Sequence, residues 1–214
     1  MKFFFKKTKK SFLKFLPFKI KKIYLKYLDK KYNVDVFICK EDKCIEKCQK
    51  LRWKIFIDEL KMFKGKNEEI EKDEFDKHSI HFLAQKNNKE VGVSRLILNS
   101  SMGFRGEKIF GNIFISENQN RDNFAEISRF GILKEHRGSY LISIKMFFSI
   151  IYIAEEIDLK YFIMAIDKRL LKAFKELKFK QYNIVGKEKD SAGVKVVPLI
   201  IKKEDLKRHL EKIF

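Results

Sequence analysis

Residues that interrupt regular structure are scarce in this sequence. Its 214 residues include two prolines and nine glycines. This scarcity excludes a collagen-like repeat and argues against extended disorder. Long apolar runs are also missing: the longest, residues 141–154, is interrupted by Lys145 and is too short to cross a bilayer. We therefore expect a buried helix there, and the 45% of hydrophobic residues suffices for one sizeable core.

Cysteine is the third scarce residue. Cys39, Cys44 and Cys48 are odd in number and form no CxxC pair. The sequence therefore predicts neither a disulfide framework nor a zinc ribbon. We expect Cys44 and Cys48, one helical turn apart, to pack as small hydrophobic side chains. This cysteine usage fits a reducing, cytoplasmic location.

The positive charge is concentrated at the N-terminus. The net charge is +19, and residues 1–31 hold twelve lysines and one acid, interleaved with aromatic residues. We divide the chain into this basic N-terminal arm, 1–31, and one domain, 32–214. The arm suits an anionic membrane surface, which would hold the protein peripherally on the inner face of the membrane. Nucleic acid is the partner we do not expect, a plain solubilising arm is the alternative, and no signal peptide is predicted.

The apolar pattern predicts alternating strands and helices. Helices are expected at 42–61, 140–157 and 168–177, and strands at 81–85, 90–98, 124–132, 161–166, 182–185 and 194–199. The first two strands form a hairpin. Segment 99–123 reads as irregular, with a short helix or strand around 109–115. The order of elements in the second half predicts a mixed α/β (α+β) layered fold.

The strand 124–132 carries three polar groups in an apolar setting: Glu126, Ser128 and Arg129. Buried charge is costly unless it is paired or used, so the segment is either a half-solvated strand with an incidental ion pair or part of a site. On a regular strand Glu126 and Ser128 face one side and Arg129 the other. A β-bulge would bring all three together.

Several motifs occur in a fixed order along the chain. They are Leu51-Arg-Trp-Lys-Ile-Phe56 with Glu59, Glu71-x-Asp73-x-x-Asp76, His81-Phe-Leu-Ala84, Val91-Gly-x-x-Arg95-Leu96 and Glu126-Ile-Ser-Arg129. This order resembles the autoinducer-synthase-like branch of the GNAT acyltransferases. That branch contains acyl-homoserine lactone synthases, long-chain N-acyl amino acid synthases and exosortase-associated acyltransferases. The resemblance covers roughly residues 40 to 200 and implies a bulge in strand 124–132.

The implied fold is a GNAT-like mixed central sheet flanked by helices, behind the basic arm. Strand 124–132, the next turn and the following helix look like the acyl-carrier-binding part of that fold. This assigns acyl-carrier or pantetheine binding to Ile132, Arg137 and Gly138. Ser139-Tyr140 stands where a second glycine is expected, so we expect acyl carrier protein rather than coenzyme A as the donor. The acyl thioester is a substrate, and no bound cofactor is expected.

The implied function is an N-acyltransferase that moves a fatty acyl group from an acyl-carrier-protein thioester to an amine. The acceptor would be an amino acid or a similar small molecule, and Glu126 would be the general base, its pKa raised beside an apolar tunnel. The residues assigned to substrate binding are Arg52, Phe56, Asp73, Asp76, Arg95, Ser128 and Arg129. Three have structural alternatives: Arg52 as a brace to Asp73 or Asp76, Arg129 as a partner of the acidic loop, and Phe56 as core.

Two other functions remain open. One is an acyl-homoserine lactone synthase that uses S-adenosylmethionine; Met62-Phe63 stands where such synthases usually have tryptophan, which speaks against it. The other is a non-catalytic basic module that binds membrane or nucleic acid through residues 1–31. His78 and His81 lie near acidic residues, but their spacing is unspecific and we expect no metal.

Overall fold

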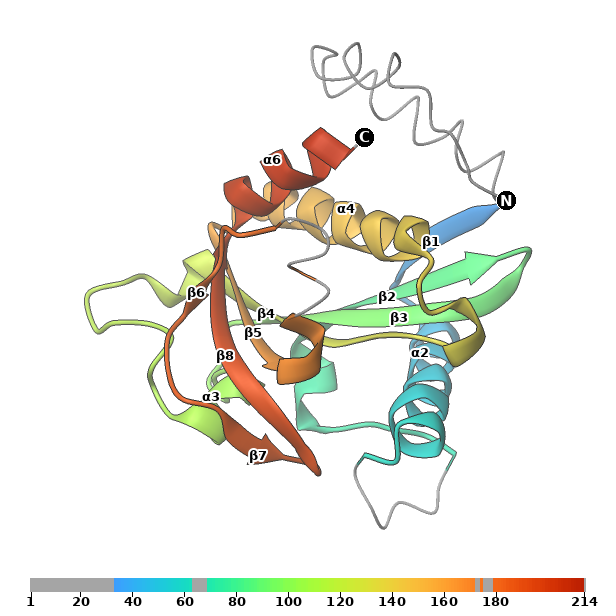
Figure 1. Ribbon diagram of the computed structural model, residues 1–214, viewed down its shortest axis with the longest axis horizontal. Coiled ribbons are helices and arrows are strands. Elements are labelled where there is room, and N and C mark those ends of the chain that lie inside the picture. Colours follow the sequence, from blue (N-terminus) through green and yellow to red (C-terminus); the bar gives the residue numbers. More distant parts are fainter. Residues whose placement is uncertain (1–32, 63–68, 172–173, 175–178, 214) are drawn as a thin grey trace.

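The computed structural model describes residues 33–62, 69–171, 174 and 179–213. The predicted arm, Phe63 and most of 172–178 lie outside the described residues. Eight strands form one sheet (Figure 1). They are β1 (Val34–Cys39), β2 (Ser79–Lys86), β3 (Lys89–Leu98), β4 (Phe124–Ile132), β5 (Tyr161–Asp167), β6 (Asn183–Ile184), β7 (Lys189–Ser191) and β8 (Val194–Lys202).

Helices connect and cover these strands. The α-helices are α2 (Asp42–Arg52), α3 (Arg105–Phe110), α4 (Tyr140–Glu156) and α6 (Lys203–Ile213). A π-helix, Trp53–Glu59, continues α2 without a break. Short 3₁₀ turns occupy Glu74–His78, Arg121–Asn123, Lys134–His136 and Lys168–Leu170. The predicted mixed α/β architecture is confirmed.

The sheet is mixed because of one strand pair. Its order is β1-β2-β3-β4-β5-β8-β6, and β7 also pairs with β8. β4 and β5 are parallel, and every other described pair is antiparallel. The parallel pairing covers three rungs, from Phe124↔Tyr161 to Glu126↔Ile163. Beyond Glu126 no strand of the described residues lies beside that edge of β4.

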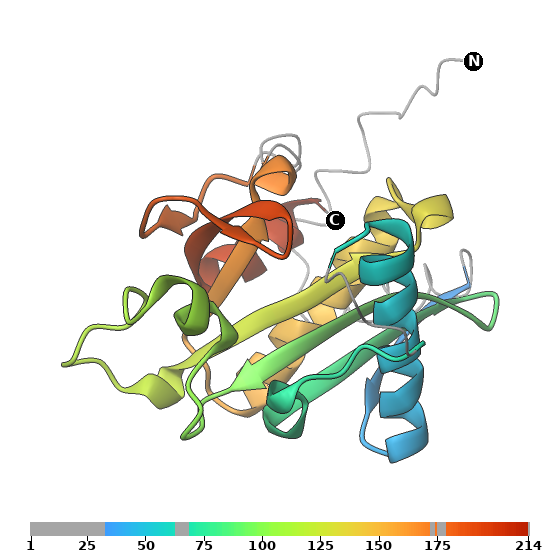
Figure 2. The same ribbon diagram turned by 90° about the horizontal axis from the view of Figure 1, so that it is seen from below.

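Helices cover both faces of the sheet, but with different side chains. α4 and α6 lie on one face and α2 on the other (Figures 1 and 2). The α4 face is packed by two apolar clusters, a large one that includes Phe82, Leu96 and Ile127 and a smaller one that includes Ile142 and Met146 of α4. The α2 face holds two smaller apolar clusters, one around α2 and one around α3. Polar residues lie between those two clusters, as described below.

The predicted buried helix at 140–157 is α4, Tyr140–Glu156. Its apolar side chains pack over β1, β2 and β3, and Lys145 is buried among them with its Nζ donating to the carbonyl of Val34. Burial lowers the pKa of Lys145 to about 8. Among the described residues, no helix combines the length and apolarity that a membrane span requires.

β1, α6 and the short strand β7 were missed by the sequence analysis, and one element was misplaced. Val34, Val36 and Ile38 alternate along β1 and pack in the apolar clusters of the α4 face. This period-2 signal was present in the sequence. α6 buries Leu206 and Leu210, which are one helical turn apart. The short helix of segment 99–123 is α3, which starts at Arg105 rather than near residue 109.

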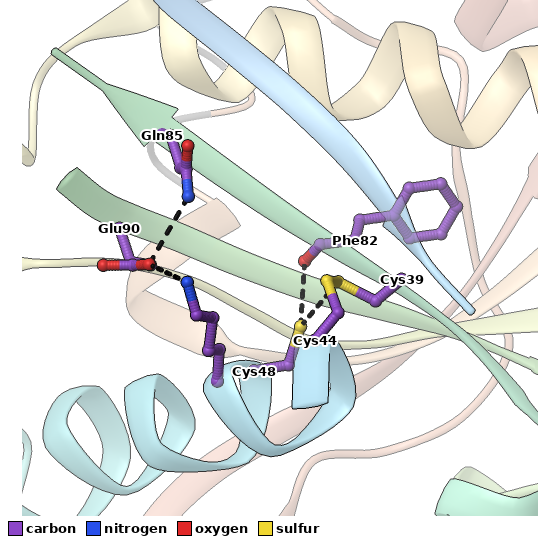
Figure 3. The surroundings of a disulfide bond; sticks show 7 residues. Cys39, Cys44, Cys48, Phe82, Gln85 and Glu90 are labelled. Carbon is purple, nitrogen blue, oxygen red and sulfur yellow. Dashed lines mark hydrogen bonds and ion pairs between the residues drawn. A yellow bond between two sulfur atoms is a disulfide. The ribbon is translucent and has the colours of Figure 1, made fainter. Parts of the chain in front are cut away.

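The expectation of no disulfide is wrong. Cys39 at the end of β1 and Cys44 in the first turn of α2 form a disulfide (Figure 3). The strand-to-helix turn brings the two residues together, which spacing alone did not indicate. Cys48 is a buried thiol whose Sγ lies 3.6 Å from that of Cys39 and 3.9 Å from the Phe82 carbonyl oxygen. Burial raises the pKa of Cys48 to about 12, so it packs as a neutral side chain.

Candidate active site

Three carboxylates reach the α2 face of the sheet from the segment that precedes β2. Glu71 is fully buried, while Asp73 and Asp76 are nearly so. Asp73 caps the 3₁₀ turn Glu74–His78 by accepting a hydrogen bond from the amide of Phe75 at 3.1 Å. The Asp73 amide in turn donates to Asp76 Oδ2 at 3.4 Å. This reciprocal capping fixes the direction of both aspartates.

Three arginines from three different elements meet these carboxylates. Arg52, the last residue of α2, donates from Nε to Glu71 Oε2 at 2.5 Å and from Nη1 to Asp76 Oδ1 at 2.6 Å. Arg95 on β3 donates to Asp73 Oδ1 at 2.5 Å and also contacts Asp76.

The third arginine completes a closed arrangement. Arg129 on β4 donates from Nη2 to Glu71 Oε1 at 2.7 Å and to Asp73 Oδ2 at 3.3 Å. Each arginine therefore contacts two carboxylates, and each carboxylate contacts two arginines. We call this set the ion ring: Arg52, Arg95, Arg129, Glu71, Asp73 and Asp76.

The ring is buried and charge-balanced. Arg52 and Arg95 have no exposed side-chain surface. Burial alone would raise the pKa of Asp73, but the hydrogen bond and charge of Arg95, helped by Arg129, outweigh it and hold that pKa well below its usual range. The pKa values of Glu71 and Asp76 are also lowered against burial, by Arg129 and Arg52 respectively. All three carboxylates are therefore ionised at neutral pH.

Arg129 reaches the ring because β4 is bulged. Arg95 pairs with Ser128 and Val93 with Gly131, so Arg129 and Phe130 together oppose one residue of β3. Arg129 has a φ of 51°, in the left-handed region. The bulge that the family resemblance implied is confirmed. It turns Arg129 to the same face of the sheet as Glu126 and Ser128.

Glu126 lies next to the ring on the last rung that joins β4 to β5. Its side chain is buried, and Oε2 accepts a hydrogen bond from the amide of Gly106 at 2.8 Å. Burial raises the pKa of Glu126 from 4.5 to about 7 against this bond and the charges of Arg105, Arg95 and Arg129. The raised pKa that the sequence analysis expected is confirmed, and it lies where a general base works best at neutral pH.

Arg105 is a charged neighbour of Glu126 that the sequence analysis missed. It is half-buried and is the first residue of α3, directly before Gly106. Burial lowers the pKa of Arg105 to about 10, and the nearby charge of Arg129 contributes. The one signal in the sequence was an Arg-Gly pair inside a segment interpreted as irregular, and nothing there indicated that it folds back over β4.

Phe56 packs against β4 from the π-helix. It is buried, and a Cβ placed on Gly131 would lie 2.9 Å from its Cζ, so the Phe56 side chain leaves room only for a glycine at position 131. The guanidinium of Arg129 is 6.0 Å from the centre of the Phe56 ring. Phe56 therefore packs against the bulged part of β4, beside the ion ring.

The residues assigned to carrier binding meet in the turn between β4 and α4. Arg137 donates from Nε to the carbonyl of Ile132 at 3.0 Å and from Nη2 to Glu59. Glu59 also accepts from the amide of Lys134 at 3.0 Å. Gly138, with a φ of 91°, leads into α4. Arg137 therefore fixes the shape of this turn through Glu59 at the end of the π-helix.

A separate surface cavity lies beyond α3. Its volume is about 410 Å³, and its lining includes Gly103, Glu107 and Arg121. Glu107 and Arg121 form an ion pair at 2.7 Å within it. Neither Glu126 nor any ring residue lines this cavity, so it is not the site described above. Among the described residues, no cluster of histidine, cysteine, aspartate or glutamate has the arrangement of a metal site.

Part of the chain matches a known protein family. A family model for an acetyltransferase (GNAT) domain matches residues 51–146. This match covers 96 of the 214 residues. The match runs from the end of α2 into α4 and so includes the whole ion ring, Glu126 and the turn between β4 and α4. No curated protein gives a significant match to the sequence.

Solved structures show the same GNAT fold over most of the chain. The AHL synthase LasI is 18% identical, with a TM-score of 0.66 over 80% of this chain and 91% of its own. The CoA-dependent acyl-homoserine lactone synthase BjaI, with SAM and isopentyl-CoA, is 16% identical, with a TM-score of 0.63 and coverages of 78% and 81%. FeeM, an N-acyl amino acid synthase from uncultured soil microbes, is 12% identical, with a TM-score of 0.57 and coverages of 81% and 92%. At these identities the likeness establishes the fold.

Proposed function

We propose that this GNAT domain transfers a fatty acyl group from a thioester to the amine of an amino acid or similar small molecule. The observation that carries the proposal is Glu126. Its buried carboxylate has a pKa of about 7, is held by the amide of Gly106, and lies where β4 and β5 part. A structural carboxylate on this strand would be paired like the ring acids, with a lowered pKa.

The chemistry follows from the position of this base. The amine attacks the thioester carbonyl, and Glu126 accepts the amine proton directly or through a water. The carbonyl π electrons move to oxygen, and their return expels the thiolate, which takes up a proton to leave as a thiol. The amide bond forms as the carbon–sulfur bond breaks. Backbone amides on the free edge of β4 are suited to stabilise the oxyanion.

The donor would lie along the free edge of β4 and against the turn that leads to α4. A pantetheine arm can hydrogen-bond to a strand edge that has no neighbouring strand. The turn carries Lys134, His136 and Arg137, and its shape is fixed by Glu59. This basic turn, with Ile132 and Gly138, suits the phosphate of a carrier-bound arm, and we take acyl carrier protein as the donor and acyl-CoA as the alternative.

Only some members of the ion ring would line the acceptor pocket, and the others would support it. The Arg52 guanidinium donates hydrogen bonds to Glu71 and Asp76 within the ring and has no exposed surface. Ser128 and Arg129 lie on the side of the ring nearest Glu126, where Arg129 is slightly exposed. We assign Arg52, Arg95 and Asp76 to holding the pocket, and Asp73, Ser128, Arg129 and Phe56 to its wall.

The test uses the full chain with an acyl carrier protein loaded with a medium or long chain. Amino acids are offered as acceptors, release of free thiol is followed, and the amide is identified by mass spectrometry. Glu126→Gln should lower kcat/KM by about 10²- to 10⁴-fold, because the variant has no base. The exposed Glu117→Gln variant is the matched control and should keep full activity. Unchanged thiol release by Glu126→Gln would overturn the assignment.

The homoserine lactone synthase remains a second candidate because the fold is shared with LasI and BjaI. S-adenosylmethionine is itself an α-amino acid, so it belongs in the same acceptor panel. A lactone product formed with release of methylthioadenosine would favour this candidate over a plain N-acyl amino acid. Amide formation with ordinary amino acids would favour the leading proposal.

The basic arm, residues 1–31, is assigned to an anionic membrane surface, where the acyl product would be released. Its twelve lysines predict binding that weakens as salt rises. Vesicles with and without anionic lipid are floated with the full chain and with a variant that lacks residues 1–31. Loss of flotation in the variant supports the assignment, whereas equal flotation of both forms contradicts it.

A further inference from the structure

Three sulfur atoms lie together where β1 meets α2. Cys39 and Cys44 form the disulfide, and the thiol of Cys48 follows Cys44 by one helical turn. The Cys48 Sγ is 3.6 Å from the Cys39 Sγ, and Figure 3 shows the three side chains gathered at one point. A movement of about 1.5 Å would bring these two sulfurs to the length of a disulfide bond. Cys48 is therefore placed to attack the sulfur of Cys39.

The three sulfurs differ in their access to solvent. Cys39 and Cys48 are buried, with exposed fractions of 5% and 0%, whereas Cys44 is only partly buried in the first turn of α2. A reagent in solution can therefore reach Cys44 but not the thiol of Cys48. Because the chain has three cysteines, one thiol is left over whichever disulfide forms. The pairing decides whether that thiol is the enclosed one or the accessible one.

Thiol–disulfide exchange converts one pairing into the other without an oxidant. The Cys48 thiolate attacks Cys39 Sγ, the Cys39–Cys48 bond forms as the Cys39–Cys44 bond breaks, and the electron pair leaves on Cys44 Sγ. The N-terminus of α2 stabilises this leaving thiolate, because its free amides and dipole favour negative charge. Burial raises the pKa of Cys48 to about 12, so little attacking thiolate is present and we expect the exchange to take hours.

Both pairings keep β1 tied to α2. β1 pairs with β2 along its whole length, and Leu51 and Ile55 hold the end of α2 and the following π-helix in one apolar cluster with Leu83 of β2. Because Cys44 and Cys48 lie on successive turns, the exchange moves the tie along the helix by about 5.4 Å. The exchange therefore changes bonds at sulfur while strand pairing and helix packing hold the fold.

We propose that Cys44 is a site of reversible S-thiolation by low-molecular-weight disulfides, and that Cys48 opens this site by taking over Cys39. After the exchange, the Cys44 thiolate attacks a disulfide RSSR, forms Cys44–S–SR and releases RS⁻, so RSSR is the oxidant. Cys39, which would otherwise displace RS⁻ and reverse the modification, is then bonded to Cys48. The modification persists until an external thiol removes it. This inference is independent of the proposed acyl transfer.

The experiment treats the full chain, isolated with its disulfide intact, with oxidised glutathione at mildly alkaline pH. Samples are quenched with acid over several hours and analysed by intact mass and by peptide mapping without reduction. The expected product carries one glutathione on Cys44 together with a Cys39–Cys48 disulfide. Reduced glutathione added afterwards should remove the modification, because an external thiol can attack the mixed disulfide.

Two variants isolate the two steps. Cys48→Ala is the matched control: it keeps the Cys39–Cys44 disulfide but has no thiol to open it, so it should take up no glutathione. The double variant Cys39→Ala/Cys48→Ala leaves Cys44 as a free thiol from the start. It should take up glutathione on Cys44 faster than the wild type, because the slow exchange step is omitted.

Three results would overturn the inference. If the wild type takes up no glutathione while the double variant does, Cys48 does not open the disulfide. If glutathione is found on Cys48, the buried thiol itself is reached and Cys44 is not the site. If the double variant does not react, Cys44 is not accessible. None of these results bears on acyl transfer, which is measured separately.

Discussion

The two faces of the central sheet bury different kinds of side chain. On the α4 face, Phe82, Leu96 and Ile127 belong to one continuous apolar cluster. On the α2 face, the neighbouring positions hold His81, Arg95 and Glu126, all buried. Because side chains alternate along a strand, adjacent residues of β3 stabilise the fold through different forces. The packing of this apolar cluster does not depend on ionisation, whereas the stability of the polar face depends on which groups are ionised.

Arg95 and Leu96 offer the largest test of this difference, since both are fully buried neighbours on β3. Arg95→Met leaves Asp73 and Asp76 short of a partner and should lower the free energy of unfolding by about 3–5 kcal/mol. Leu96→Ala removes apolar contacts from the opposite face and should cost about 2–5 kcal/mol. Chemical denaturation at pH 7 measures both values.

The pH dependence then separates the two variants. The pKa values of Glu71, Asp73 and Asp76 are lowered in the folded state, so their stabilisation is present above the unfolded pKa near 4 and is lost as pH falls below it. As pH falls, Leu96→Ala should lose as much unfolding free energy as the wild type, and Arg95→Met should lose less. Identical acid profiles for the two variants would contradict the ring as the source.

Glu126 reverses the sign of the pH effect on the same face. Its pKa is raised from 4.5 to about 7 on folding, so the folded state binds an extra proton between these values and stability falls as pH rises through that window. Glu126→Gln should therefore be more stable than the wild type at pH 8, by up to about 3 kcal/mol, and equally stable at pH 4. Thermal unfolding at both pH values decides this. Equal stability at pH 8 would show that the carboxylate is not held in an unfavourable ionised state.

The disulfide gives the smallest expected effect. It closes a short loop between Cys39 and Cys44, which by loop entropy contributes about 2 kcal/mol. Dithiothreitol should lower the free energy of unfolding of the wild type by that amount. The double variant Cys39→Ser/Cys44→Ser is the control and should not respond to the reductant. A wild type that does not respond either would mean that the bond does not stabilise the fold.

Elements defined by local periodicity could be predicted from the sequence. The hairpin of β2 and β3, the strand β4 and the helix α4 were all expected within a few residues of their observed bounds. Two further elements, β1 and α6, had readable signals and were overlooked. On a regular strand Glu126 and Arg129 would face opposite sides of the sheet. The sequence analysis therefore predicted that both share one face only if the strand is bulged, and the bulge is present.

The arrangement of the site depended on contacts that no local pattern encodes. Arg52 and Glu71 are 19 residues apart, and Arg129 and Glu71 are 58 apart, yet all three share hydrogen bonds. The sequence analysis gave pairing of Arg52 and Arg129 with the acidic segment as alternatives, but it did not predict that three arginines and three carboxylates form a closed ring. Arg105 was missed for the same reason, since its position near Glu126 depends on a segment with no periodicity folding back over β4.

The short parallel pairing of β4 and β5 has a mechanical consequence. The β1–β4 part and the β5–β8 part of the sheet are joined through the three paired positions from Phe124 to Glu126. Glu126 is the last residue of β4 that pairs with β5. Any separation of β4 from β5 that starts at this end of the pairing therefore reaches Glu126 first, so the strand pairing and the environment of its carboxyl group are linked through the backbone.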